Sequence, residues 1–222
     1  YGLEWTSFEA GQLPSKDRER DRAVPLYSLL GEAIAAIKKA DGGHPVSLTN
    51  GDLGYLDLIA EHCKGLDIFG ANVYRGPSVR DLFQVVKDKL DLPVLFSEFG
   101  SDAFDARAGR EDALAQARVE LAQWQEIYEQ SAGKGRVGNA IGGFLFQFSD
   151  GWWKTGQTVR LEQHDTAASW ATDAYAFDFV AGENNMNEEW FGIAALDPPD
   201  RDKYYRVRPR TAYYVLQAAL RL

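Results

Sequence analysis

Four short strand-like runs alternate with helical patterns, and this alternation constrains the fold most strongly. The clearest run is Pro93–Gly100, which is apolar, carries no helical period and is too short to span a membrane, so it predicts a strand buried on both faces. Successive runs lie roughly 25 to 45 residues apart, which leaves room for a crossover helix between them. The pattern predicts an α/β protein with a parallel sheet. The expected strands cover residues 44–49, 66–71, 93–98 and 141–148.

Amphipathic patterns fill the intervals between these strands. Pro25 is expected to begin the first helix in its first turn, and Gly42-Gly43 to end it. Further helices are expected over residues 52–63, 79–90 and 111–131, and from Pro209 onward. The side chains of the longest helix that recur at intervals of three and four, and are therefore expected to face the core, are Leu114, Ala117, Leu121, Trp124 and Tyr128.

The predicted organisation is a single partial barrel domain over residues 1–222. Residues 1–24 are expected to form the loop after strand four, although the alternating charges of residues 16–22 would also suit a solvated helix face. Residues 25–149 carry the βα units, and residues 208–222 form a closing helix. The irregular tract 150–207 is expected to cover the active-site face, since an ordered loop of this length is usually functional.

Two architectures share this pattern, a doubly wound open sheet and half of an eight-stranded barrel. A phosphate-binding Gly-x-Gly-x-x-Gly follows none of the strands, because Gly133, Gly135 and Gly138 come after a helix. We therefore favour strands 5–8 of a TIM (β/α)8 barrel. Four parallel strands alone leave two unpaired edges. We expect an N-terminal barrel half, upstream of residue 1 in the same or a separate chain, to complete the barrel.

Composition excludes several classes of partner. The net charge of −9 argues against nucleic acid and anionic membranes, and no apolar run is long enough to span a bilayer. The lone Cys63 excludes an intrachain disulfide and a multi-cysteine metal site. Aromatic residues make up 13%, which is typical either of sugar binding or of a large aromatic core. We expect no cofactor and no metal, and favour an extracellular or periplasmic location over a cytoplasmic one.

Polar side chains follow the predicted strands where catalytic residues of parallel barrels lie. Glu98 ends the buried strand within Ser97-Glu98-Phe99-Gly100. Asn72 and Tyr74 end the preceding strand and share one face, because side chains alternate along a strand. A solvated Glu that opens a loop is the alternative for Glu98, and a half-buried aromatic residue is the alternative for Tyr74.

Three strand ends resemble those of retaining glycoside hydrolases, most closely the catalytic barrel of glycoside hydrolase family 2. The likeness covers most of residues 25–157 and 187–222, and it also includes His44-Pro45-Val46 and Arg210–Tyr214. Ser97–Gly100 is fairly specific when it stands between the other two elements. The segments that resemble strands six, seven and eight are Asp67–Gly76, Pro93–Gly100 and Gly142–Trp153.

The resemblance implies that Glu98 is the nucleophile and that Tyr74 donates a hydrogen bond to it. A retaining glycosidase pairs its nucleophile with an acid/base carboxyl group about 5–5.5 Å away. In the family this group ends strand four in an Asn-Glu motif, and no Asn-Glu precedes residue 25, although Glu4 and Glu9 lie in the right region. We place the acid/base upstream of Tyr1. The fragment alone should be nearly inactive, since losing an acid or base costs about 10²–10⁴-fold.

Other residues near these strand ends are candidates for binding sugar. Asn72 stands where the family often has His, and Phe146 stands where it usually has Trp, so Phe146 is expected to stack more weakly. Trp152 or Trp153 would replace that Trp, or else cap the core. Gln147, Asp150 and Lys154 would hydrogen-bond hydroxyl groups, although Asp150 could equally cap the next segment.

The tract 150–207 adds polar and aromatic candidates. His164 and Trp170 stand out, and we expect Glu189 and Trp190 to form a wall of the substrate site unless the tract is a structural insertion. The expected function is hydrolysis of O-glycosidic bonds in an oligo- or polysaccharide. A transglycosylase would use the same residues, and a non-catalytic carbohydrate-binding or scaffold protein is the alternative from another class.

Overall fold

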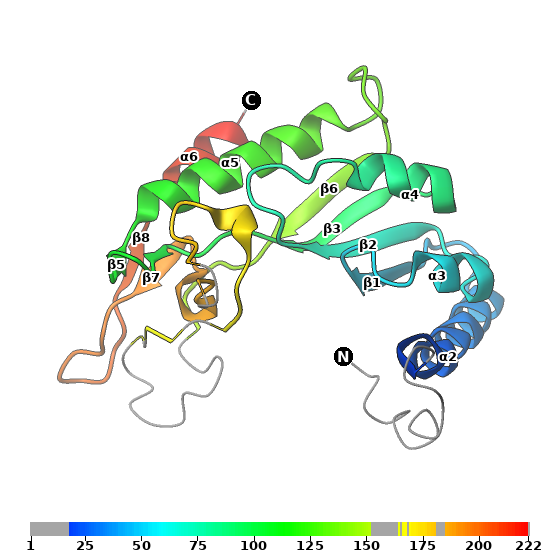
Figure 1. Ribbon diagram of the computed structural model, residues 1–222, viewed down its shortest axis with the longest axis horizontal. Helices are drawn as coiled ribbons and strands as arrows, with labels where there is room; N and C mark the ends of the chain where they lie inside the picture. Colours follow the sequence, from blue (N-terminus) through cyan, green and yellow to red (C-terminus); the bar gives the residue numbers. More distant parts are fainter. Residues whose placement is uncertain (1–17, 152–163, 165, 168, 181–184, 222) are drawn as a thin grey trace. The chain divides into compact units, whose positions relative to one another are not determined.

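The chain folds into two compact units, which are described here one by one. The computed structural model describes residues 18–151, 164, 166–167, 169–180 and 185–221 (Figure 1). Unit 1 comprises Tyr1–Asn72, Asp81–Leu95 and Gln130–Ile141. Unit 2 comprises Val73–Arg80, Phe96–Glu129 and Gly142–Leu222.

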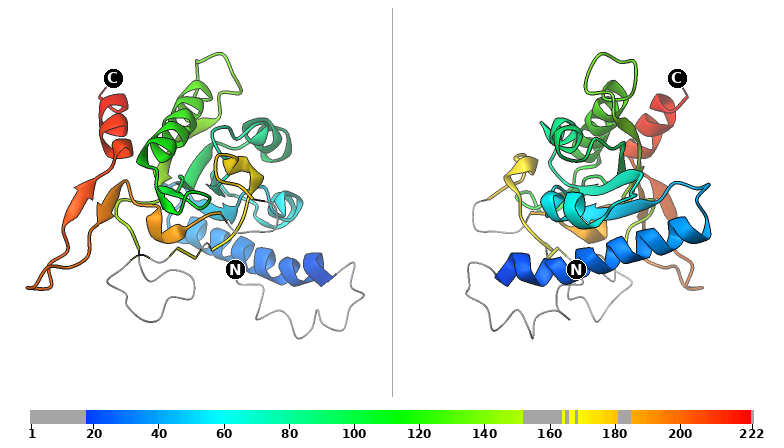
Figure 2. Two further views of the ribbon diagram at one scale, coloured as in Figure 1. Left: turned by 60° about the vertical axis from the view of Figure 1, so that its left-hand side comes forward. Right: turned by 90° about the vertical axis from the view of Figure 1, so that its right-hand side faces the viewer.

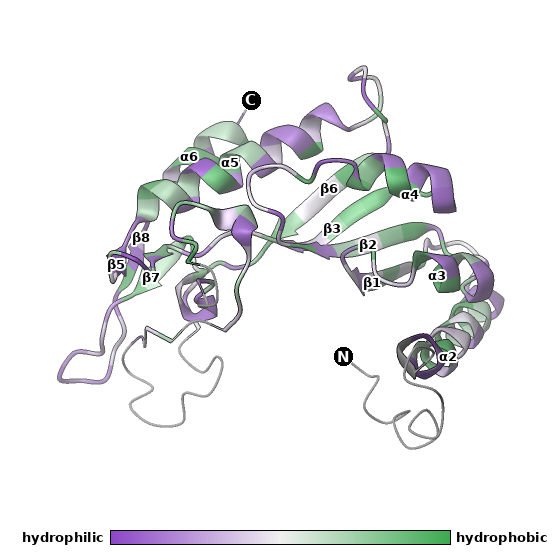
Figure 3. Ribbon diagram, in the orientation of Figure 1, coloured by the Kyte–Doolittle hydropathy of each residue, from purple (hydrophilic) through white to green (hydrophobic). Residues whose placement is uncertain are grey.

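A four-stranded sheet confirms the predicted α/β class with a parallel-strand sheet. Strands β1 and β2 pair in parallel, with Ser47 opposite Ile68, as expected for strands joined by a crossover helix. Figure 3 shows hydrophobic residues along β2 and β3, as for strands covered on both faces. The strands in spatial order are β1 (Ser47–Gly51), β2 (Ile68–Val73), β3 (Val94–Phe99) and β6 (Ala140–Leu145).

The helices among the described residues of unit 1 are α2 (Arg18–Ala40), α3 (Leu56–His62) and α4 (Leu82–Leu90). Helix α3 contacts both α2 and α4 (Figure 2). Helix α4 buries Leu82, Phe83 and Val86, as its amphipathic pattern predicts. No helix among the described residues is long and apolar enough to cross a membrane.

Helix α2 begins earlier than the sequence predicts. Residues 18–24 are helical instead of forming a loop, and Pro25 lies inside the helix instead of in its first turn. Proline removes one backbone hydrogen bond, but the helix continues through it because Ala23 and Tyr27 on either side are both buried. Arg20 also contacts Glu61 of α3, with 3.6 Å between Nη2 and Oε2. The exposed Arg20 therefore lies on a solvated face of this helix.

Unit 2 contains two helices in contact, α5 (Ala113–Glu129) and α6 (Thr211–Ala219). Within the tract 150–207 the structure has short elements that the sequence pattern did not predict. The antiparallel pair β7 and β8 leads into α6 (Figure 2). The short elements of unit 2 that precede this tract are β4 (Phe104–Asp105) and β5 (Arg110–Glu111). Those within it or at its end are η2 (Asp173–Tyr175), η3 (Glu188–Trp190), β7 (Ala194–Leu196) and β8 (Val207–Pro209).

Helix α5 faces the core with a different side from the one expected. Leu114, Leu121 and Tyr128 are exposed, at 50%, 38% and 60%. Ala117 is buried as predicted, and Trp124 is half-buried with its ring 5.2 Å from that of Phe99. The expectation was wrong for the exposed three because polar side chains occupy the inner face. Those buried polar side chains are Gln116, Glu120 and Gln123.

Candidate active site

Glu98 and Tyr74 form a hydrogen-bonded pair at the ends of two strands. Glu98 is the penultimate residue of β3, and Tyr74 directly follows β2. The Tyr74 hydroxyl donates to Glu98 with 3.1 Å between Oη and Oε2. Both side chains are half-buried, so Glu98 is neither sealed in the core nor fully solvated. The structure thus brings together the two residues that the sequence placed at neighbouring strand ends.

Electrostatics keeps the Tyr74 hydroxyl protonated. Burial raises the pKa of Tyr74 above its usual range, and the negative charge of Glu98 raises it further. The carboxylate of Glu188, which lies in η3, acts in the same direction. Tyr74 is therefore a permanent donor to Glu98 across the physiological pH range.

Aromatic side chains enclose Tyr74. The rings of Trp170 and Phe191 lie 5.5 Å and 5.6 Å from the Tyr74 ring in edge-on contact, the favoured geometry for aromatic pairs. Phe146 contacts Phe191 at 5.9 Å and belongs to the same apolar cluster, and its peptide bond to Gln147 is cis. Sequence reasoning noticed Trp170 and assigned it no role, and it missed Phe191. The signal for both was the aromatic richness of the tract after the last strand.

Asp150 has a structural position instead of the predicted sugar contact. It is fully buried, and Arg210, also buried, binds it at 2.5 Å and 2.8 Å. His164 Nε2 lies 2.7 Å from the same carboxylate, and the Gly192 amide donates to it at 3.0 Å. These partners leave the carboxylate no access to a sugar. Asp150 therefore links the chain after β6 to the start of α6, and its bonds to the Gly192 and Leu196 amides are closer to the capping role that the sequence left open than to a sugar contact.

Trp190 and Glu189 are also packed against protein. The Trp190 ring stacks on His164 at 4.1 Å and contacts Phe104 at 4.9 Å, and the Arg210 guanidinium lies 5.7 Å from its centroid. Glu189 is buried at 4% exposure. Glu189 is therefore largely covered, whereas Trp190 is half-buried, and the substrate wall stays a prediction beside the structural insertion that the sequence also allows.

The remaining predicted sugar contacts divide into two groups. Gln147 is half-buried, and its buried Nε2 atom has no hydrogen-bond partner among the described residues. Asn72 is half-buried at the end region of β2, where its carbonyl accepts a hydrogen bond from the Asp52 amide at 3.0 Å. Trp152, Trp153 and Lys154 lie outside the described residues, as do Glu4 and Glu9.

A buried polar face of α5 holds the chain that leaves β3. Gln116 donates through Nε2 to the Ser101 carbonyl at 3.1 Å. Burial raises the pKa of Glu120 well above its usual range, although the Ser101 backbone and the charge of Arg210 lower it. Burial raises the pKa of Asp102 in the same way. Sequence reasoning missed this face, whose only signal was polar residues recurring at three and four within a helix.

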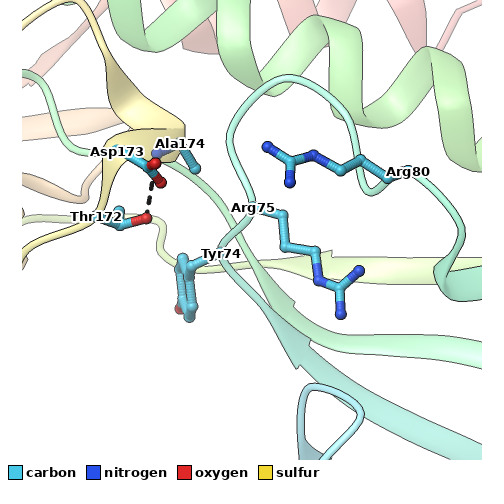
Figure 4. A pocket seen from close by; sticks show the side chains of 6 residues that line it. All are labelled: Tyr74, Arg75, Arg80, Thr172, Asp173 and Ala174. Carbon is cyan, nitrogen blue, oxygen red and sulfur yellow. Dashed lines mark hydrogen bonds between the residues drawn. The ribbon is translucent and has the colours of Figure 1, made fainter.

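A small pocket adjoins Tyr74 on the side of the segment after β2. Its volume is about 180 Å³, and it is lined by Tyr74, Arg75 and Arg80, and by Thr172, Asp173 and Ala174 around η2. Figure 4 shows the Arg80 guanidinium extending toward η2 and that of Arg75 extending away from it. Arg75 also donates to the Val79 carbonyl at 3.2 Å. Among the described residues, no cluster of three His, Cys, Asp or Glu side chains could hold a metal ion.

Comparisons with known proteins bear on the fold alone. No family model matches the chain, and no curated protein matches it. Among solved structures, the monomer of a hyperthermophilic beta-glucosidase mutant that forms a dodecamer in the crystal matches with a TM-score of 0.50 and 12% identity, over 91% of this chain and 49% of that one.

A GH113 beta-1,4-mannanase complex matches with a TM-score of 0.42 and 15% identity, over 86% of this chain and 56% of that one. The chain thus spans about half the length of each of these glycosidases. The first likeness shows that this α/β fold is similar to part of a TIM-barrel glycosidase. Neither match singles out family 2.

Proposed function

We propose that this chain is the nucleophile-bearing half of a retaining glycoside hydrolase barrel similar to family 2. It would act on an O-glycosidic bond of an oligo- or polysaccharide, with Glu98 as the nucleophile. The observation that carries the proposal is the hydrogen bond from Tyr74 to Glu98, with a half-buried carboxylate at the end of a parallel strand. The likeness of the fold to part of a beta-glucosidase supports it.

In the first step a carboxylate oxygen of Glu98 attacks the anomeric carbon, and the leaving oxygen takes a proton from the acid/base. In the second step a water molecule gives its proton to the acid/base, and its oxygen attacks the anomeric carbon. The bond to Glu98 then breaks and the carboxylate is restored. Tyr74 donates a hydrogen bond to the nucleophile in the resting state and so orients its carboxylate.

We place the acid/base on a barrel half that residues 1–222 do not supply. The chain spans 49% of the beta-glucosidase whose fold it resembles, which is consistent with strands 5–8 of such a barrel. Besides Glu98, Glu188 is a described carboxylate whose charge reaches Tyr74, and it lies in η3 rather than at the end of a strand. Replacing Glu188 by Gln should therefore leave the labelling of Glu98 measurable.

The test is covalent labelling with activated 2-fluoroglycosides that differ in sugar and anomeric configuration. Such reagents trap the glycosyl-enzyme, and their good leaving group reduces the need for the acid. The expected result is one adduct by intact mass, mapped by peptide sequencing to Glu98 and absent in Glu98→Gln. A folded protein that binds sugars and forms no adduct would overturn the proposal and favour a non-catalytic carbohydrate-binding protein. An adduct that is released faster by added sugar than by water would indicate a transglycosylase.

A further inference from the structure

One buried amide contacts the backbone beyond both members of the Tyr74–Glu98 pair. Gln123, in the middle of α5, is 1% exposed. Its Nε2 atom donates to the carbonyl of Gly76 at 2.9 Å and to that of Gly100 at 3.4 Å. Gly76 lies two residues after Tyr74, and Gly100 lies two residues after Glu98. A single side chain therefore bridges the two segments that carry the pair.

Tyr175 strengthens the same bridge from another element. Its hydroxyl donates to the Gly100 carbonyl at 2.7 Å, and the ring is 1% exposed in η2. Burial raises the pKa of Tyr175 above its usual range, while the backbone of Gly76 and the side chain of Gln123 lower it. The hydroxyl consequently stays protonated and remains a donor to Gly100.

Both glycines lie where a side chain would collide with neighbouring backbone. Gly76 has a φ of 75°, and a Cβ atom there would lie 2.2 Å from the Ala174 carbonyl oxygen. A Cβ atom at Gly100 would lie 2.3 Å from the Phe146 carbonyl oxygen. These close approaches require glycine at both positions, because any side chain would displace neighbouring backbone.

These two segments lie just beyond the ladder of the sheet, since β2 ends at Val73 and β3 ends at Phe99. Buried carbonyls that leave a sheet need other donors, and here the donors come from α5 and η2. We infer that Gln123 is a positioning residue that sets the separation of the Tyr74 hydroxyl and the Glu98 carboxylate. Its importance for catalysis rests on the proposed function, whereas its effect on the hydrogen bond does not.

The test compares Gln123→Met with Ile127→Ala. Methionine has a similar length and no donor, so it removes both bonds to Gly76 and Gly100. Ile127 lies one turn further along α5 and is also buried, at 3% exposure, so Ile127→Ala destabilises the same helix without removing a polar contact.

The readout is the exchange rate of the Tyr74 hydroxyl proton, followed by NMR in protein with labelled tyrosine and assigned by Tyr74→Phe. We expect exchange to become roughly tenfold faster in Gln123→Met and to stay within about twofold of the parent in Ile127→Ala. Unchanged exchange in folded Gln123→Met would overturn the inference. If that variant does not fold, Gln123→Asn decides the question, because its shorter amide reaches one carbonyl at most and should also speed exchange.

Labelling by the 2-fluoroglycoside adds a readout of chemistry. Gln123→Met should slow the labelling of Glu98, and it should have no further effect in a Tyr74→Phe background, since the bond that it positions is then absent. Equal slowing in both backgrounds would contradict a role through Tyr74. If the parent itself is not labelled, the proposed function fails, and the hydroxyl exchange still decides whether Gln123 positions the pair.

Discussion

Helices α4 and α5 both cover part of the structure, but they do so with opposite chemistry. Helix α4 buries Leu82, Phe83 and Val86, and its polar residues face the solvent. Helix α5 buries a polar face and exposes apolar side chains, including Leu121. An apolar face gains free energy from any close packing, whereas buried amides need particular partners at particular distances.

This difference indicates where directed polar contacts fix the position of the backbone. The polar face of α5 contacts the segments that follow Tyr74 and Glu98, and the pair from Asp150 to Arg210 holds the start of α6. Directed contacts fix backbone positions better than dispersion does, so they are expected near a site that depends on geometry. Four predictions test this comparison, from the largest expected effect to the smallest.

The largest effect is expected for Arg210→Met. It leaves the fully buried Asp150 carboxylate without its cation, which should cost about 3–5 kcal/mol of the free energy of unfolding, measured in urea. The double variant Asp150→Asn with Arg210→Met should recover part of the loss. A cost under about 1 kcal/mol for the single variant would show that the pair is dispensable.

Leu82→Ala examines the apolar helix. The Leu82 side chain is completely buried, so its loss should cost about 3 kcal/mol through lost burial and an unfilled cavity. Because α4 buries an apolar face instead of a polar one, the exchange rate of the Tyr74 hydroxyl should not change. A change in that rate would remove the distinction between the two helices.

Glu120→Gln tests the buried acid through the pH dependence of stability. The folded-state pKa of Glu120 is raised above its unfolded value of 4.5, chiefly by burial. The contribution of Glu120 to the free energy of unfolding is therefore fully present below about pH 4.5. It is lost by about 1.4 kcal/mol per pH unit as the pH rises toward the folded-state pKa. In urea unfolding at pH 5, 6 and 7, the free energy of unfolding of Glu120→Gln should increase relative to that of the parent as the pH rises. Leu82→Ala should lower stability without this trend, and a constant difference between Glu120→Gln and the parent would contradict a neutral Glu120.

The smallest effect is expected for Leu121→Lys on the exposed side of α5. Leu121 is 38% exposed, and lysine is a good helix former, so the free energy of unfolding should change by no more than about 0.5 kcal/mol. Ala117→Lys, at a buried position of the same helix, is the contrasting variant and should be strongly destabilising. Comparable losses for both variants would mean that Leu121 is covered in the folded protein.

The Glu98–Tyr74 pair followed from the strand ends together with the family resemblance. Glu98 and Tyr74 could be paired because parallel strands bring their carboxyl ends to one edge, and the two side chains are 3.1 Å apart. Asp150, Glu189 and Trp190 could not be assigned in this way. Their burial depends on partners such as Arg210 and His164, which are distant in sequence.

The sequence by itself determined the four strands of the parallel sheet and most of the helices, because hydrophobic period and strand length are local properties of the chain. The boundary of α2 was missed, since burial of Ala23 and Tyr27 outweighs the local effect of Pro25. Only the tertiary structure decided which face of α5 is buried. The buried carbonyls of Gly76, Gly100 and Ser101 lie outside α5 and need amide donors from that face. A local sequence pattern does not show that these carbonyls will lie against the helix.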